Sequence, residues 1–377
     1  MNILFLMQFA WCVVTVVLAM ILVASRFQMR WRNRRYEVSR KLLVASMLLL
    51  AAHFILQMSQ GFRAKSDELG TVINLLFFTP VVFLISYATF HVVCYREGRR
   101  RYLMVGGISY ALVLFAFIIG ISRSGSIHPG AMLYVMLACF VACMLYCILA
   151  NIREIRHHRK IMEEETAMDM LPYDRYTWAS YVLVCASIIM LTASILYRPL
   201  LLVIAPIMLV SIIVFTMNFI GYGYNIMPTE VEEEEDAEPS QDVGGQELMD
   251  EPAEIVDDSQ ALPAERVREI GQALAAWCEA GGFRDSAITL PLLCKKVRFT
   301  KSELTTYFER HLKSTFRVWL SDIRFAEVQR MIRENPHYSN DVISAECGFS
   351  SHAHLYKIFK AKTGMTPRQW RDSLAKE

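Results

Sequence analysis

The sequence predicts an all-α chain in three parts: a seven-helix transmembrane bundle, a disordered acidic linker and a compact domain of short helices. Hydrophobic residues make up 54% of the chain and are concentrated in its first 225 residues. Between residues 230 and 258 there are fourteen Asp and Glu and no Lys or Arg. From residue 262 onward there are nineteen Lys and Arg against thirteen Asp and Glu, so this end is basic although the whole chain has a net charge of +2. We therefore place the parts at 1–224, 225–261 and 262–377.

Seven apolar stretches in the first part are long enough to cross a bilayer, whose hydrocarbon core needs about 20 residues per helix. They are 3–25, 42–61, 71–95, 102–122, 131–151, 176–197 and 200–223. After the fifth stretch, the mixed charges up to Glu165 predict a solvated helical extension rather than a metal site.

The loops between these stretches differ in charge. The loops after the first, third and fifth contain seven, four and five Lys and Arg, whereas the alternate loops contain two, one and one. Because basic loops stay in the cytoplasm, we expect a multi-pass protein of the cell (inner) membrane with its N-terminus outside and its C-terminal domain inside. The first stretch lacks a basic N-terminal flank, so we expect it to be retained rather than cleaved.

Polar residues within the spans are candidates for a ligand site. His53 and Gln57 lie one helical turn apart on the second span and could face a membrane cavity. Hydrogen bonding between helices explains the same pattern and is the interpretation we favour. Cys139, Cys143 and Cys147 recur every four residues, which is typical of close helix packing. We expect no cofactor, no metal and no disulfide framework, and we find no H-E-x-x-H, G-x-S-x-G or glycine-rich phosphate motif that would indicate an enzyme.

The acidic residues of 230–258 are interrupted by Pro and Gly. Such a composition cannot build a core, so this part is predicted to be a disordered tether.

Residues 341–371 have the pattern of two short helices joined by a glycine turn. Val342, Ile343 and Ala345 provide the apolar face of the first helix, and Gly348 follows where the chain turns. Ser351 is a suitable N-cap for the second helix, in which Leu355 faces inward. We expect the outer face of the second helix to be polar and basic, as in a helix-turn-helix that reads the DNA major groove. The residues expected on it are His352, Ala353, His354, Lys357 and Lys360.

This stretch closely resembles the C-terminal signature of AraC/XylS-type transcription factors. The matching positions are Ile343, Gly348, Phe349, Ser351, Leu355, Lys357, Phe359, Lys360, Gly364, Thr366, Pro367, Trp370 and Arg371. Ser344 stands where the family usually has alanine. The resemblance implies two helix-turn-helix units joined by one helix, here 316–332, over about 115 residues.

The first unit is expected at 290–311, with its turn at Arg298, Phe299 and Thr300. It matches less well, because Arg298-Phe299 and Lys313-Ser314 stand where the family often has glycine. The resemblance implies base reading by Ser302, Thr305 and Thr306 in the first unit and by His352, Ala353, His354 and Lys357 in the second. Lys301, Ser351 and Lys360 complete the expected DNA-binding set. Thr366 and Arg371 are expected to support the fold or contact phosphate.

These features together predict a membrane-embedded bacterial transcription regulator that binds double-stranded DNA, with a homodimer on DNA as one arrangement. We expect it to respond to an unknown small ligand or membrane partner protein. An alternative is a transporter or channel-like protein whose helix-turn-helix tail is a protein-interaction module. Few polar residues converge across the spans, which favours the regulator.

Overall fold

The computed structural model describes residues 3–28, 33–61, 67–94, 97–125, 127–167, 169–196, 201–225 and 262–374. The chain divides into two compact units. The first contains Met1–His158 and Met170–Pro228, and the second contains Arg159–Asp169 and Thr229–Glu377. The described residues form helices and no β-strand, which confirms the all-α prediction. The linker predicted at 225–261 lies, apart from its first residue, outside the described residues.

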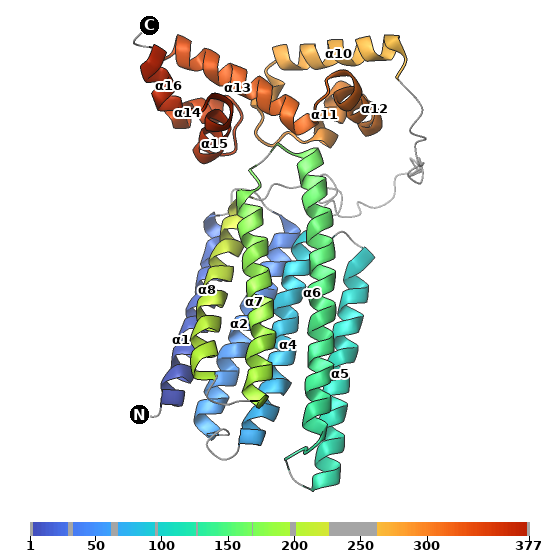
Figure 1. Cartoon of the computed structure of the whole chain (residues 1–377), viewed down its shortest axis with the longest axis vertical. Coiled ribbons are helices and arrows are strands. Elements are labelled where there is room, and N and C mark those ends of the chain that lie inside the picture. The colour runs from blue at the N-terminus through green and yellow to red at the C-terminus, as the bar shows by residue number, and fades with distance from the viewer. Residues whose placement is uncertain are drawn as a thin grey trace, which may run out of the picture. The chain divides into compact units, whose positions relative to one another are not determined.

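The first unit is a bundle of long helices (Figure 1). They are α1 (Ile3–Ala24), α2 (Arg34–Gln60), α4 (Asp67–Val93), α5 (Glu97–Ser124), α6 (Met132–Glu165), α7 (Leu171–Leu196) and α8 (Leu201–Asn225). Each contains one of the seven predicted spans or most of it. Within the described residues, six helices are long and apolar enough to cross a membrane, and α7 is not among them. α6 runs on to Glu165, as the sequence predicts.

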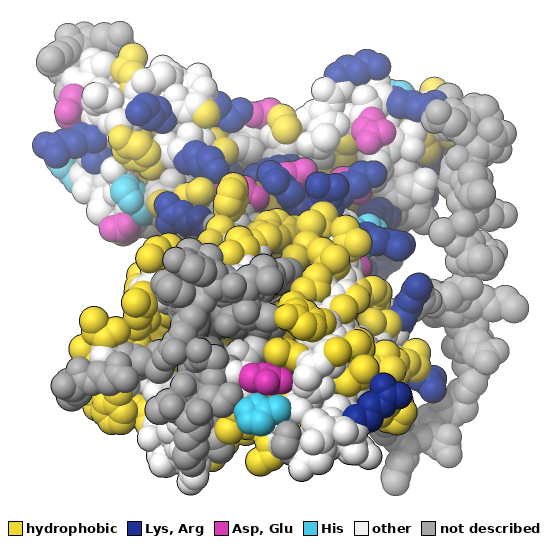
Figure 2. All heavy atoms as spheres, turned by 60° about the horizontal axis from the view of Figure 1, so that its bottom comes forward, with side chains coloured by type: hydrophobic (Ala, Val, Ile, Leu, Met, Phe, Trp, Pro, Cys, Tyr) yellow, Lys and Arg dark blue, Asp and Glu magenta, His cyan; other side chains and the backbone are white. Residues whose placement is uncertain are grey.

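Helices of the bundle pack side by side: α1 contacts α2 and α8, and α4 contacts α2, α5 and α7. Hydrophobic side chains also cover much of the bundle surface visible in Figure 2. Phe115 on α5 and Leu149 on α6, for example, are more than 60% exposed. A surface of this kind suits contact with lipid chains rather than with water.

Buried polar side chains join the helices of the bundle. Asn151 on α6 donates from Nδ2 to Ser86 Oγ on α4 at 3.0 Å and to Tyr102 OH on α5 at 3.1 Å. Gln57 on α2 donates to Asn74 on α4 at 3.0 Å. His53 is fully buried, with the rings of Phe54, Phe77 and Phe78 around it. The contact of Gln57 is therefore a hydrogen bond between helices, which is the interpretation that the sequence favoured.

The described part of the second unit contains seven shorter α-helices. They are α10 (Ala264–Glu279), α11 (Leu290–Val297), α12 (Lys301–Thr306), α13 (Phe316–Glu334), α14 (Asn340–Glu346), α15 (His352–Thr363) and α16 (Pro367–Leu374). They surround two hydrophobic cores. α13 contributes Phe316 and Leu320 to the first core and Val328, Met331 and Ile332 to the second, so it bridges the two helix pairs as expected.

Candidate nucleic-acid interface

The first helix pair consists of α11 and α12. Thr289 caps α11 by accepting from the Leu292 amide. At the end of α11, Arg298 has a left-handed backbone with φ of 61°, where glycine would be unstrained. Thr300 and Glu303 then form a reciprocal capping box that starts α12. The turn therefore lies at 298–300, as predicted, without the help of a glycine.

The second helix pair consists of α14 and α15. α14 ends at Glu346, and Gly348 two residues later has a φ of +75°. Ser351 caps α15 by accepting from the His354 amide. Leu355 and Phe359 of α15 are fully buried in the second core. This is the helix-turn-helix geometry predicted from the sequence, with α15 in the position of the recognition helix.

Contacts at residues 283–285 hold the two pairs together. The buried Arg324 of α13 donates to the carbonyl oxygens of Phe283 and Asp285, each at 2.9 Å. Burial lowers the pKa of Arg324 to about 10, so it remains charged at neutral pH. A Cβ atom on Gly348 would lie 2.5 Å from the Phe283 oxygen, so the glycine turn fits closely against the same segment.

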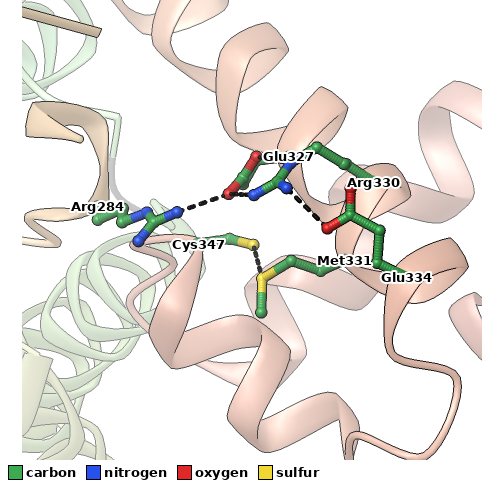
Figure 3. Close-up of polar contacts among 6 residues, drawn as sticks. All are labelled: Arg284, Glu327, Arg330, Met331, Glu334 and Cys347. Atoms are coloured by element: carbon green, nitrogen blue, oxygen red, sulfur yellow. Dashed lines mark hydrogen bonds and ion pairs between the residues drawn. The ribbon is translucent and has the colours of Figure 1, made fainter. Parts of the chain in front are cut away.

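Figure 3 shows a second set of contacts around α13. Glu327 accepts from Arg330 on the same helix and from Arg284 in the segment before α11. The hydrogen bond from Arg330 lowers the pKa of Glu327, and the hydrogen bond from Arg284 lowers it further. Burial acts in the opposite direction but is the weaker effect. Below this pair Cys347 donates to Met331 Sδ at 3.3 Å, and burial raises the pKa of its thiol to about 12. The relative position of the two helix-turn-helix units is thus fixed by specific side chains.

Most of the expected DNA-contacting residues are accessible on α12 and α15. Thr305 and Thr306 are partly buried on α12. The exposed ones are Lys301, Ser302, His352, Ala353, Lys357 and Lys360. Exposed polar residues on both recognition helices provide the groups needed for base and phosphate contacts.

The expectation that His354 lies on the outer face is wrong. Its side chain is only 5% exposed, its ring packs edge-on against Phe349 at 5.5 Å, and its Nδ1 lies 3.3 Å from Ser350 Oγ. Burial lowers the pKa of His354 to about 4, so the imidazole is neutral at physiological pH. His354 lies one helical turn before Ile358 and next to Leu355, so it shares the side of α15 that packs on the second core.

Three further residues of the expected set support the fold. Ser351 uses its hydroxyl as the α15 cap. Thr366 exchanges two hydrogen bonds with Gln369 and so starts α16. Arg371 donates to the carbonyl of Tyr338 and to Asn340 Oδ1, and thereby links α16 to the beginning of α14.

Sequence reasoning did not foresee the burial of Arg324 on α13. A helical wheel treats an arginine as a surface residue, so no local signal pointed to its burial.

Two exposed lysines of the recognition helices are ion-paired with acidic residues that lie far away in the sequence. Lys301 of α12 contacts Glu165, and Lys357 of α15 contacts Asp169 at 3.1 Å. Both acidic residues belong to the 159–169 segment of the second unit.

Comparison with known proteins agrees with this architecture. A family model described as a helix-turn-helix domain matches residues 293–373. The transcriptional activator RhaR of Salmonella dublin is 28% identical over 87 residues, which are 23% of this chain and 30% of the relative. RhaR of Escherichia coli O1:K1 is 29% identical over 86 residues, which are 23% and 30% of the two chains.

The chain thus covers less than a third of the relatives it matches. No solved structure matches it. The C-terminal part of the chain is an AraC-type helix-turn-helix domain, as the sequence resemblance implied.

Proposed function

We propose that this protein is a membrane-embedded transcription regulator whose C-terminal domain binds specific DNA sequences under the control of a signal received by the membrane bundle. The observation that carries the proposal is the combination of two linked helix-turn-helix units with a bundle containing six helices apolar enough to cross a membrane. The distribution of basic loops supports a cytoplasmic location for the DNA-binding domain.

In this proposal α12 and α15 enter successive major-groove segments on one face of the duplex. Ser302, Thr305 and Thr306 of α12 contact base edges in one segment. His352, Ala353 and Lys357 of α15 contact them in the next, while Lys301 and Lys360 bind phosphates. His354 is left out because it is buried. Two domains in a homodimer would raise each other's effective concentration on adjacent sites.

The test is genome-wide crosslinking and DNA capture with the full-length protein. A variant carrying Ser302→Ala, His352→Ala and Lys357→Ala removes exposed side chains of both recognition helices. A matched control carries Arg268→Ala, which removes an exposed cation from α10. We expect discrete peaks for the wild type and the control, loss of the peaks in the triple variant, and all three proteins in the membrane fraction.

Other results would contradict parts of the proposal. Sequence-independent capture by all three proteins would refute specific DNA reading and favour a protein-interaction role for the helix-turn-helix domain. Recovery of the intact wild-type protein in the soluble fraction would refute membrane embedding.

A further inference from the structure

The end of α6 and the residues that follow it pack against the DNA-binding domain. Residues Arg159–Asp169 form part of the second unit, although the chain on both sides of them belongs to the bundle. Thr166 forms an isolated antiparallel bridge with Thr289, the residue that caps α11. The next residue, Ala167, is only 7% exposed and lies in the first hydrophobic core. The segment is therefore attached to the first helix-turn-helix unit by backbone and apolar contacts.

The two acidic side chains that flank this attachment contact different recognition helices. Glu165 pairs with Lys301 at the start of α12, and Asp169 pairs with Lys357 in the middle of α15. The carboxylates are well covered, at 20% and 13% exposure, while the lysines remain about half exposed at 52% and 58%. One short segment thus places one negative charge on each recognition helix.

These carboxylates occupy two lysines that the proposed function assigns to DNA, Lys301 to a phosphate and Lys357 to base edges. A lysine ammonium that pairs with a carboxylate offers less charge to phosphate, and DNA affinity depends mainly on such cations. Ion pairs that are half exposed are individually weak, so the contact is reversible. The buried side chain of Ala167 is a single methyl group, so its apolar contact also adds little to the strength of the attachment.

We propose that the end of α6 at Glu165 and the following residues Thr166, Ala167 and Asp169 form a built-in competitor, which occupies the DNA-reading face and must leave before the domain binds DNA. This inference rests on the proposed function. The segment continues from α6 on one side and leads to α7 on the other, so a rearrangement of these two helices of the bundle is the event that releases it. The competitor is thereby the route from the membrane signal to the DNA-binding domain.

The experiment measures the affinity of the full-length protein, in lipid nanodiscs, for a fluorescent mixed-sequence DNA duplex. The test variant carries Glu165→Gln and Asp169→Asn. The control variant carries Glu163→Gln and Glu164→Gln, which changes the net charge equally on the same segment but breaks only the local pairs with Arg159 and Lys160. Two weak ion pairs correspond to about a three- to tenfold change in an equilibrium constant, so the test variant should bind that much more tightly than the wild type. The control should change the Kd by less than about twofold.

A double-mutant cycle shows whether the effect acts through the recognition helices. When Lys301 and Lys357 are both replaced by alanine, the Glu165→Gln and Asp169→Asn changes should no longer strengthen binding beyond the control. A tighter Kd in the test variant that disappears in this background supports the competitor.

Two results would overturn the inference. Equal DNA affinity of the wild type, test and control proteins would refute the competitor while leaving the proposed function standing. Absence of DNA binding by all variants, including the test variant, would refute the proposed function and the competitor with it.

Discussion

Replacement of Gly348 by alanine should destabilise the DNA-binding domain more than the same change at any open glycine. Gly348 has a φ of +75°, and a Cβ atom there would lie 2.5 Å from the Phe283 oxygen and 2.8 Å from the Arg284 oxygen. Both neighbours are backbone atoms, and the Phe283 carbonyl is also held by Arg324. The new methyl group therefore cannot be accommodated by a side-chain rotation.

The expected magnitude has two parts. A left-handed conformation costs an L-residue about 1–2 kcal/mol. Overpacking of a methyl group against fixed atoms adds about 1–3 kcal/mol. Gly364→Ala is the matched control, because Gly364 has a φ of +74° but a Cβ added to it would meet no atom within 4 Å, so it carries only the first part.

The assay is hydrogen exchange of α14 and α15 peptides in the full-length protein, which gives the free energy of local opening. We expect Gly348→Ala to lower this free energy by about 2–5 kcal/mol and Gly364→Ala by about 1–2 kcal/mol. Equal losses of this free energy in the two variants would refute the argument from the close approach of the Phe283 and Arg284 oxygens. The left-handed backbone would then explain the whole effect.

Three other residues of the same domain give further predictions. Arg324→Met should lower the free energy of unfolding by about 2–4 kcal/mol, because it leaves the Phe283 and Asp285 carbonyls without their donor. Urea unfolding followed by tryptophan fluorescence would measure this loss. An unchanged free energy of unfolding would show that water replaces the guanidinium. Arg298→Gly should be about 1 kcal/mol more stable than Arg298→Ala in the same assay, since both remove the charge but only glycine relieves the left-handed strain. The pKa of His354 is lowered to about 4, so the unfolded chain takes up a proton near pH 6.5 while the folded domain does not, and stability should fall as the pH drops from about 6.5 to about 4. His354→Gln should reduce that loss, whereas His352→Gln at an exposed position should not. An equal fall of the urea midpoint between pH 7 and pH 5 in the two variants would contradict the burial argument.

The helices of the bundle show what apolar content can and cannot define. The predicted span 42–61 lies within α2 (Arg34–Gln60), and 131–151 lies within α6 (Met132–Glu165), apart from one residue at an end of each. Hydropathy finds the part suited to the bilayer core, while backbone hydrogen bonding carries each helix on into polar residues. The boundaries 1–224, 225–261 and 262–377 and the seven-span topology remain predictions.

In the C-terminal domain, local signals were sufficient for the helix-turn-helix units. Gly348, Ser351 and Thr366 act on residues within a few positions of themselves, through backbone conformation and capping, so the printed sequence predicts their effects. The same holds for the apolar spacing that buries Leu355 and Phe359.

The sequence by itself determined the helical class, the apolar bundle and the two helix-turn-helix units, because these depend on hydropathy, helical periodicity and caps within short stretches. Tertiary structure decided which polar groups are buried and which are paired. His354 and Arg324 are buried by residues outside their own helices, which a helical wheel of α15 or α13 does not include. Glu165 and Asp169 reach lysines 136 and 188 positions away. Such pairings arise only when separate segments pack together, and no local pattern encodes them.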